Sequence, residues 1–519
     1  MGGVQLADAS EARLCRLIQE RIGIRILDHQ RQNLLRTVSA ACELFNLPDG
    51  ERYCDALASS QADSQLQEQL IAGITVGESY FFRDRWQMQL LRQTLLPNLI
   101  ASRRLSGHYS LRIWSAGCSD GQELYSIAML LDNLLPPHEK WNLHLLGTDI
   151  NVPALARALR GEYRRWSFRA TAGEDLERYF EEIPQSEGEI IWSVSAALRK
   201  QVRFSYLNIF TDSFPSILSE TSAMDLILCR NVFIYFDAPT IAVVMRKFHA
   251  ALNVGGSLLL GPSDLIERSA TEGFIYRGDE NSHYYERGDA THLPPLVVAP
   301  RSYQSQSVAS DLPVAAPAPV SDAERAVRLP AALRPYSKII RLFGDEAWGD
   351  ALNEAERLLR QGDNSVFVWQ FLAKALANMG RARDALKACD ESLKLDPDKH
   401  VYFIQALILL ELKRLQAAED ALRRTIFIDR YFVEAHYHLG LLLIRSGREE
   451  AGIKSLKNAL DIAVTASPQR RLHDAGQMDY GRLVQIIRNE LRMYQSFQQQ
   501  RKLKNMDFLS DDWSSTGHG

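Results

Sequence analysis

The stretch from Leu111 to Leu124 reads LRIWSAGCSDGQEL, and it predicts the fold of the region around it. Its first six residues form a short, mostly apolar run, which is typical of a buried parallel strand. Gly117 and Gly121 follow and lead into a helical pattern. In α/β sheets, glycines after a strand let the backbone approach a ligand closely at the edge where nucleotides bind. The stretch therefore predicts the strand, turn and helix of an α/β domain with a binding site.

The same alternation continues along the chain. Three further runs are each short enough for a buried parallel strand: LHLLGTD at 143–149, DLILCR at 225–230 and GSLLLG at 256–261. Helical stretches over Glu123–Leu135 and Thr240–Leu252 lie between these runs. The segment FIYRGDENSHYYER, residues 274–287, reads as a hairpin that closes the sheet with antiparallel strands. This order predicts a doubly wound α/β sheet over residues 75–288.

Two segments differ from this alternation. Residues 176–204 contain YFEEI, EIIWSVS and VRFSY, and they predict a small inserted β-subdomain. Residues 1–74 show helical periodicity and predict an N-terminal helical domain. Its first two helices carry regularly placed arginines, for which a solvated face and a surface for an acidic partner are both open readings: Arg13, Arg16, Arg21, Arg25, Arg31 and Arg36.

The C-terminal part is a repeat. Residues 289–328 are rich in Pro, Ala and Ser without periodicity, which indicates a linker. Beyond it Ala351, Ala385, Ala418 and Ala451 recur at spacings of 34, 33 and 33 residues, the period of a tetratricopeptide repeat. We therefore expect a tetratricopeptide (TPR) α-solenoid and a trailing helix over 329–500, and a disordered tail over 501–519. The groove of the TPR solenoid could hold a receptor, a signalling protein or the chain's own α/β domain.

Composition excludes several classes of function. A net charge of −4 over 519 residues gives no reason to expect nucleic acid or an anionic membrane as partner. The 6 cysteines lack CxxC or zinc spacing. We therefore expect the protein in the reducing cytoplasm, and we predict no metal site. There is no apolar run of 18 residues and no layout of a signal peptide at the N-terminus.

Acidic residues stand at the predicted binding edge. Asp149 ends the second strand, 28 residues past Gly121, where an acid can accept hydrogen bonds from both hydroxyls of a ribose. Glu123 lies in the first turn of the helix after the glycines. It is either a partner of the helix dipole or a carboxylate for a cationic amino group of the cofactor. Together these residues favour a nucleoside-type cofactor over a purely structural turn.

Two arginines stand in unusual surroundings. Arg83 follows three aromatic residues in ITVGESYFFRD, residues 74–84, where a guanidinium has packing for its stem and a reason to point inward. Arg230 interrupts the apolar run ILCRNVFIYF, residues 227–236. Since burying a charge is unfavourable unless it is paired or used, either the strand ends at Cys229 or Arg230 faces a pocket.

With these motifs in place, residues 1–288 resemble the CheR family of S-adenosylmethionine-dependent chemoreceptor methyltransferases. The resemblance rests on ESYFFRD, WSAGCSDGQELYSIA, LGTDI and ILCRNVFIYF, and the repeats resemble those of CheR proteins with a fused TPR domain. It implies a Rossmann-like methyltransferase sheet after a helical domain. It also implies methyl transfer to receptor glutamates, with S-adenosylhomocysteine as product. In some members the β-subdomain binds a receptor's C-terminal peptide as an added strand.

The resemblance also implies roles for individual residues. Glu123 would hold the methionyl amino group and Asp149 the ribose, with Asn208 and Ile209 near the adenosine. Arg83, Arg230 and Asn231 would line the cofactor and substrate mouth, and Tyr235 would face the methyl-transfer site. Gly117 would belong to the cofactor turn. Gly77 and Ser79 stand where some members have Asn and Thr, so at Gly77 only the backbone can contact the cofactor.

The implied chemistry gives Arg230 a purpose. A carboxylate is already ionised at neutral pH, so it needs desolvation and in-line placement but no general base. Arg230 at the end of a strand is expected to hold the incoming carboxylate. Two alternatives remain: a methyltransferase acting on nucleic acid or a small molecule, and a catalytically decayed fold that serves as a TPR scaffold. The second predicts loss of Glu123, Asp149 or Arg230, all of which are present.

Overall fold

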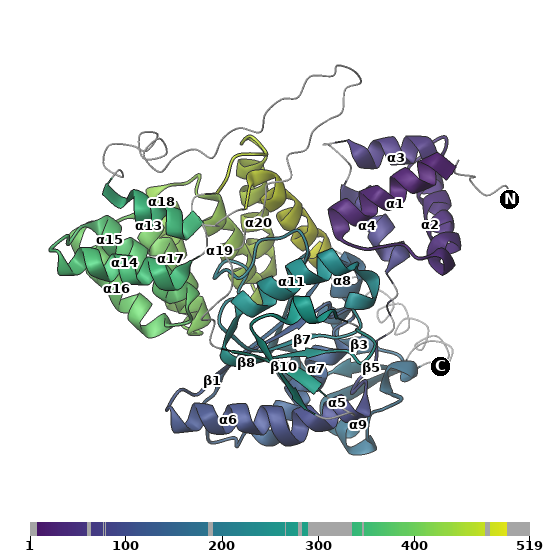
Figure 1. Cartoon of the computed structure of the whole chain (residues 1–519), viewed down its shortest axis with the longest axis horizontal. Helices are drawn as coiled ribbons and strands as arrows, with labels where there is room; N and C mark the ends of the chain where they lie inside the picture. Colours follow the sequence, from purple (N-terminus) through teal and green to yellow (C-terminus); the bar gives the residue numbers. More distant parts are fainter. Residues whose placement is uncertain are drawn as a thin grey trace, which may run out of the picture.

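The computed structural model describes residues 8–59, 64–75, 77, 79–184, 190–264, 266–278, 283–288, 335–344, 347–472 and 478–495. Figure 1 shows a helical N-terminal part, a sheet flanked by helices, and a stack of paired helices from the C-terminal part of the chain. The predicted linker at 289–328 and the tail at 501–519 lie outside the described residues. The domain boundaries stay predictions.

The N-terminal part is a bundle of four helices: α1 (Asp8–Ile22), α2 (Arg31–Leu44), α3 (Gly50–Ala58) and α4 (Ser64–Ile74). Apolar residues three and four apart meet in its core, where Leu14, Ile18 and Val38 are at most 1% exposed. Two of the regularly placed arginines form ion pairs with acids of the same bundle. Arg13 pairs with Asp55 at 2.7 Å, and Arg31 pairs with Glu11.

A mixed sheet of seven strands forms the centre of the molecule, in the order β6-β2-β1-β7-β8-β10-β9. Its strands are β1 (Ser110–Ala116), β2 (Asn142–Asp149), β6 (Val202–Tyr206), β7 (Met224–Cys229), β8 (Leu252–Leu260), β9 (Phe274–Gly278) and β10 (His283–Arg287). The four predicted parallel strands and the antiparallel hairpin are confirmed. Along β1, Ile113 faces one core and Trp114 the other, which explains the continuous apolar run.

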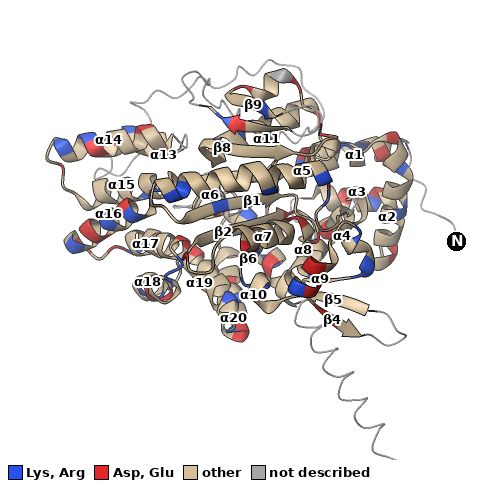
Figure 2. Cartoon of the chain, turned by 90° about the horizontal axis from the view of Figure 1, so that it is seen from below, with Lys and Arg blue, Asp and Glu red and all other residues tan. Residues whose placement is uncertain are grey.

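Helices cover both faces of this sheet: α5 (Arg85–Leu90), the π turn η2 (Leu91–Leu95), α6 (Leu96–Leu105), α7 (Gln122–Leu134), α8 (Val152–Arg160) and α11 (Ala238–Ala251). Figure 2, turned by 90° from the view of Figure 1 and seen from below, shows α6 and α7 beside the strands. The short helix η5 (Phe233–Tyr235) follows β7 at the carboxyl edge of the parallel strands. None of the described helices combines the length and the hydropathy that a membrane crossing requires.

One part of the prediction for the inserted β-subdomain is wrong. The segment VRFSY forms β6, which pairs in parallel with β2 and is the edge strand of the main sheet. The small antiparallel sheet consists of β3 (Glu162–Tyr163), β5 (Ile190–Val194) and β4 (Phe180–Pro184), next to α9 (Gly173–Tyr179) and α10 (Ala196–Arg199). β-propensity identifies a strand but not its partner, and here β6 pairs with β2, where Phe204 packs closely on Gly147 and Gly121, which have no side chains.

The repeats are paired helices: α13 (Ser337–Gly344), α14 (Trp348–Arg360), α15 (Val366–Asn378), α16 (Ala382–Leu395), α17 (Lys399–Glu411), α18 (Leu415–Ile428), α19 (Val433–Arg445) and α20 (Glu449–Ala463). A further helix spans residues 480–495. Ala351, Ala385 and Ala418 are fully buried, as the period predicts. In the last unit Ala451 is exposed and Gly452 is buried instead. The site is too tight for a side chain, since a Cβ added at Gly452 would lie 2.5 Å from Ile444 Cγ1.

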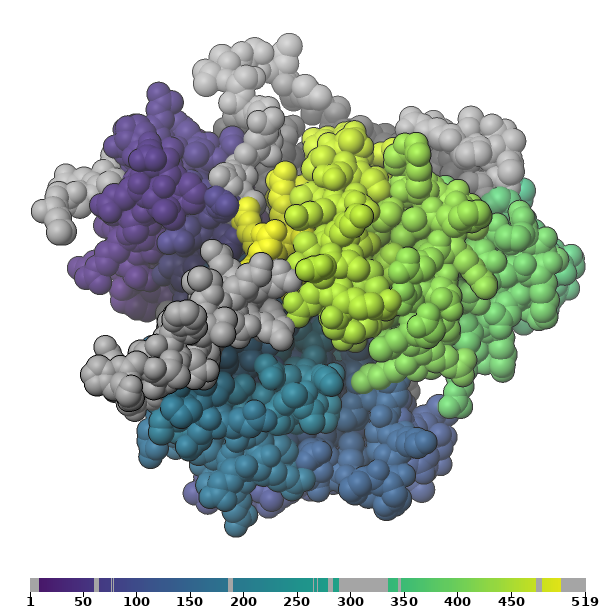
Figure 3. All heavy atoms as spheres, turned by 180° about the vertical axis from the view of Figure 1, so that it is seen from behind, coloured from purple at the N-terminus to yellow at the C-terminus, as the bar shows by residue number. Residues whose placement is uncertain are grey.

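The repeats pack against the α/β domain, which is one of the three partners that the sequence left open for them. Asn142 Nδ2 donates to the Glu411 carbonyl at 2.9 Å, and Arg112 Nη1 lies 3.1 Å from Glu411 Oε1. Farther along, Ile217 N donates to Asn378 Oδ1 at 3.1 Å. Figure 3 shows the C-terminal helices pressed against the central domain and next to the N-terminal bundle.

Candidate functional site

A cavity of about 240 Å³ opens at the carboxyl edge of the parallel strands, against the N-terminal bundle. This is the edge where α/β sheets bind their ligands. All the residues predicted to bind the cofactor or to line the site lie in its wall, whereas Gly121 does not: Gly77, Ser79, Arg83, Gly117, Glu123, Asp149, Asn208, Ile209, Arg230, Asn231 and Tyr235. Their individual roles stay predictions.

The glycine turn forms one wall of the cavity. Gly117 has φ +81°, and a Cβ there would lie 2.5 Å from Val232 Cγ2. Gly121 has φ +88°, and a Cβ there would lie 2.7 Å from Phe204 Cζ. Both positions need glycine for its backbone and for its lack of a side chain. Gly117 therefore brings bare backbone to the cavity, as a closely held ligand requires, and Gly121 lets the turn pack on Phe204 of β6.

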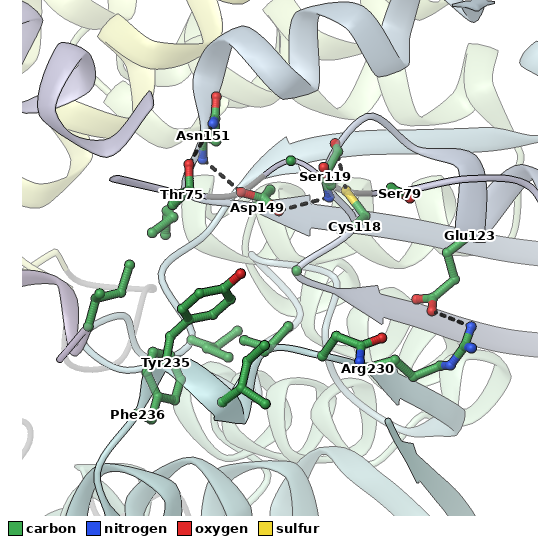
Figure 4. Close-up of a pocket in the computed structure, with 18 of the residues that line it drawn as sticks. Thr75, Ser79, Cys118, Ser119, Glu123, Asp149, Asn151, Arg230, Tyr235 and Phe236 are labelled. Carbon is green, nitrogen blue, oxygen red and sulfur yellow. Dashed lines mark hydrogen bonds and ion pairs between the residues drawn. The ribbon is translucent and has the colours of Figure 1, made fainter. Parts of the chain in front are cut away.

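Asp149 anchors the turn to the end of β2. Its Oδ2 accepts from Ser119 N and its Oδ1 from Asn151 N, both at 2.8 Å. Burial raises the pKa of Asp149, while these backbone donors act to lower it. Each carboxylate oxygen keeps a lone pair, so the pair of oxygens can accept two further hydrogen bonds from neighbouring hydroxyls. Figure 4 shows Asp149 between Ser119 and Asn151 on the cavity wall.

Glu123 is held by two donors at the start of α7. Ser115 Oγ donates to Glu123 Oε1 at 2.6 Å, and Arg230 Nη1 donates to Oε2 at 3.1 Å. The carboxylate side chain keeps 15% of its surface exposed. It is therefore oriented by the protein and still accessible to a cationic group in the cavity.

Arg230 follows directly after β7, which ends at Cys229 as one of the two readings predicts. Its side chain is only 2% exposed, and each nitrogen has a partner. Nε donates to Gln87 Oε1 at 2.5 Å, Nη2 to the Arg83 carbonyl at 2.5 Å, and Nη1 to Glu123. This geometry favours a different role from the predicted one: Arg230 joins Glu123 to the segment 83–87 and does not reach outward for a carboxylate.

Asn231 turns the chain away from the strand with φ +59°. Its N–H donates to Asp264 Oδ2 at 2.6 Å, and the Gly261 N–H donates to the same oxygen at 2.8 Å. Oδ1 accepts from Ile234 N at 3.2 Å. Burial raises the pKa of Asp264 to about 6. Asp264 thus holds the loop that carries Tyr235, and sequence reasoning missed it because it lies 33 residues past Asn231 along the chain.

Asn208 braces the opposite wall. It is 4% exposed, and its Nδ2 donates to the carbonyls of Arg21 at 3.3 Å and Ile22 at 3.5 Å in the N-terminal bundle. Its Oδ1 accepts from Phe210 N at 2.9 Å. The side chain therefore stabilises the turn and its contact with the bundle.

Tyr235 lies at the end of η5, and its carbonyl accepts from Arg25 N of the N-terminal part at 2.8 Å. In Figure 4 Tyr235 lies across the cavity from Asp149, and its hydroxyl points into the space between them. Ile234, 41% exposed, and Phe236 lie beside it in the cavity wall. This side of the site is apolar apart from the phenol.

The aromatic residues before Arg83 pack on the α/β domain. Phe81 is fully buried and stacks on Phe168 at 5.0 Å between ring centroids, with Phe180 edge-on at 5.0 Å. Arg83 has its guanidinium 5.8 Å from the Tyr80 ring, and both residues line the cavity. The aromatic run therefore fixes segment 80–83 on the α/β domain, with Arg83 at the cavity.

Sequence reasoning missed the other lining residues, and only Asn151 had a signal that could have identified it. Thr75, at the end of the bundle, accepts from Asn151 Nδ2 at 2.8 Å and connects two walls. Asn151 could have been found as the N-cap residue after Asp149, because its side chain accepts from Ala154 N at 2.9 Å. The remaining ones are Ile22, Ile24, Tyr80, Cys118, Ser119, Ile150, Leu207, Val232, Ile234 and Phe236.

Comparison with known proteins agrees with this site. Residues 77–280 match the family model described as CheR methyltransferase, SAM binding domain, and residues 368–399 and 433–463 match a tetratricopeptide repeat. Chemotaxis protein methyltransferase 1 of Pseudomonas aeruginosa is 35% identical over 228 residues, covering 41% of this chain and 77% of that relative. The chemotaxis protein methyltransferase of Escherichia coli is 32% identical over 260 residues, covering 50% and 85%.

A longer relative matches the repeats as well. The probable biofilm formation methyltransferase WspC of Pseudomonas aeruginosa is 26% identical over 447 residues, covering 85% of this chain and 96% of its own. The cavity fits the cofactor that the family model names, because Glu123 suits a cationic amino group, Asp149 suits a pair of hydroxyls, and the glycines admit close backbone contact. This chain belongs to the CheR family of methyltransferases, which use S-adenosylmethionine, and it carries C-terminal tetratricopeptide repeats.

Proposed function

We propose that the chain transfers the methyl group of S-adenosylmethionine to glutamate γ-carboxylates of chemoreceptor-type proteins and forms methyl esters. S-adenosylmethionine supplies an electrophilic methyl group on a sulfonium sulfur. The observation that carries the proposal is the chemistry of the lining. Among the described residues around the cavity there is no histidine or lysine, and both carboxylates are engaged by donors of the protein. A nucleophile that needs no general base suits such a site, and a carboxylate is one.

The chain's own residues would then act by positioning. Glu123 would hold the amino group and Asp149 the ribose hydroxyls, while Arg230 keeps Glu123 in place. We assign the incoming carboxylate to Arg83 and the Tyr235 hydroxyl, because both line the cavity while Arg230 is buried. Ile234 and Phe236 would exclude water from the carboxylate and so make it more reactive.

The relatives support the receptor as substrate. Those of Pseudomonas aeruginosa and Escherichia coli are named as chemotaxis protein methyltransferases, and this chain spans at least 77% of each of them. WspC, which matches 85% of this chain, is named for biofilm formation. The receptors to be tested should therefore include signalling receptors whose output is not motility.

The test uses S-adenosylmethionine labelled on its methyl group and the cytoplasmic parts of receptors from the same cell. We expect label that mild base releases as methanol, because a carboxyl ester hydrolyses under those conditions. Tyr235→Phe should lower kcat at least about tenfold while cofactor affinity stays within about twofold, since it removes one hydrogen bond at the reacting group. Tyr276→Phe, on the exposed strand β9, is the matched control and should change neither quantity.

Other outcomes would contradict the proposal. Base-stable label would mean transfer to nitrogen or another target class. Cofactor binding without transfer to any receptor would support a scaffold in which the repeats act alone. A Tyr235→Phe variant with unchanged kcat would remove the phenol from the transfer step.

A further inference from the structure

The helix over residues 480–495 reaches the cofactor site from the far end of the chain. Arg482 Nη2 donates to Asp212 Oδ2 at 2.6 Å, and Arg482 Nε lies 2.5 Å from Asp212 Oδ1. The side chains are 21% and 3% exposed, so the pair is largely removed from water. Asp212 belongs to the α/β domain and comes just after the residues that line the cavity.

Asp212 closes the turn that carries those lining residues. Asn208 N donates to Asp212 Oδ2 at 2.7 Å, the same oxygen that Arg482 binds, and Asp212 N donates to the Asn208 carbonyl at 2.9 Å. Leu207, Asn208 and Ile209 line the cavity. Two hydrogen bonds therefore separate a guanidinium of the C-terminal helix from the wall of the cofactor site.

The same helix joins two other parts of the molecule. Glu490 Oε1 accepts from Ser205 Oγ of β6 at 2.8 Å, and Glu490 is 1% exposed. Arg492 Nη1 donates to Glu68 Oε2 of α4 at 2.6 Å. The helix thus touches the edge strand that leads into the turn and also the bundle that forms the other side of the cavity.

A second cation also holds the turn. Lys247 Nζ of α11 donates to the carbonyls of Phe210 at 2.6 Å and Asp212 at 2.9 Å. In these two bonds Lys247 donates to main-chain oxygens. Arg482 instead binds the Asp212 carboxylate, which accepts a hydrogen bond from Asn208 N. Loss of Arg482 would therefore loosen the turn without releasing it completely. A buried ion pair adds little net stability, but it selects one geometry.

We propose that Arg482 is a positioning residue of the cofactor site, and that the helix over 480–495 sets the affinity for S-adenosylmethionine through Asp212. The C-terminal region is then part of the catalytic unit as well as a docking surface. This inference does not rest on the proposed substrate, because it concerns cofactor binding alone.

The test measures S-adenosylmethionine binding to the full chain by calorimetry. We expect Arg482→Gln to raise Kd at least about tenfold, equivalent to about 1.4 kcal/mol. Arg482→Lys keeps the charge and should recover part of the affinity. The matched control is Arg448→Gln, which breaks a pair with the buried Glu419 inside the repeats. It should leave Kd within about twofold.

Hydrogen exchange of the protein without cofactor is the second readout. In Arg482→Gln we expect faster exchange of the Asn208, Phe210 and Thr211 amides, with exchange in β1 and β7 unchanged. If that variant does not fold, Arg482→Lys decides the question by the same two measurements. Unchanged Kd and unchanged exchange in the folded variant would overturn the proposal. So would an equal rise in Kd for Arg448→Gln, because the effect would then be general destabilisation of the repeats.

Discussion

Replacing Arg230 by lysine separates the two roles that this residue could have. The guanidinium makes three contacts at 2.5 to 3.1 Å, with Gln87 Oε1, the Arg83 carbonyl and Glu123 Oε2. A lysine keeps the positive charge but places it at one point, so it cannot reach three acceptors that lie in different directions. Two of the three buried acceptors would then lose their donor.

The expected magnitude follows from these contacts. Each hydrogen bond to a charged group contributes about 1.5 to 3 kcal/mol, and a lysine can restore one of the three. We expect Arg230→Lys to lower the free energy of unfolding by at least about 3 kcal/mol, for the two bonds lost. We also expect the Kd for S-adenosylmethionine to rise at least about tenfold, since Glu123 loses the donor that orients it.

The assay combines urea unfolding of the protein without cofactor and calorimetric titration with S-adenosylmethionine. The matched control is Arg157→Lys, because Arg157 pairs with Asp120 at 2.9 Å with 43% of its side chain exposed. Such a pair contributes less than about 1 kcal/mol, and the substitution should leave Kd unchanged.

One result would refute this reasoning. If Arg230→Lys left stability and cofactor affinity within about 0.5 kcal/mol of the wild type and raised only KM for the receptor, Arg230 would hold the substrate carboxylate after all. The buried geometry would then have to change when substrate binds.

Three further predictions concern the glycine turn and two acids. Gly121→Ala should lower the free energy of unfolding by about 3 kcal/mol in urea unfolding, since its Cβ would lie 2.7 Å from Phe204 Cζ at φ +88°; Gly107→Ala, at φ +68° with no atom within 4 Å, should lower it by only about 1 kcal/mol. Asp149→Asn loses one of two acceptors for backbone N–H groups, so calorimetry should show a Kd for S-adenosylmethionine raised about 10- to 100-fold. Burial raises the pKa of Asp264 from 3.8 to about 6, so the folded protein holds this proton more tightly and its contribution to stability falls by about 3 kcal/mol as pH rises through that range. The unfolding free energy of the wild type minus that of Asp264→Asn should therefore fall by about 1.4 kcal/mol between pH 5 and pH 8, and a difference independent of pH would contradict the shifted pKa.

The local signals in the sequence were sufficient for the sheet and for much of the site. Apolar runs, glycines and strand-end acids follow one another within a few residues, and parallel strands bring their carboxyl ends to the same edge. For that reason the sequence alone predicts that Glu123 and Asp149, far apart along the chain, share one cavity. For Arg230 the unfavourable burial of an unpaired charge left two readings open, and the structure shows that β7 ends at Cys229 and that the buried guanidinium is paired.

Contacts between distant segments were decided only by the tertiary structure. The partners of Arg230, the acceptor Asp264 and the pairing of β6 with β2 depend on how elements pack across the sheet. The contact of Arg482 with Asp212 joins residues 270 positions apart. Spacing along a chain determines which side chains share a strand or helix face, but it does not determine which faces meet. That choice depends on the shape and burial of whole domains.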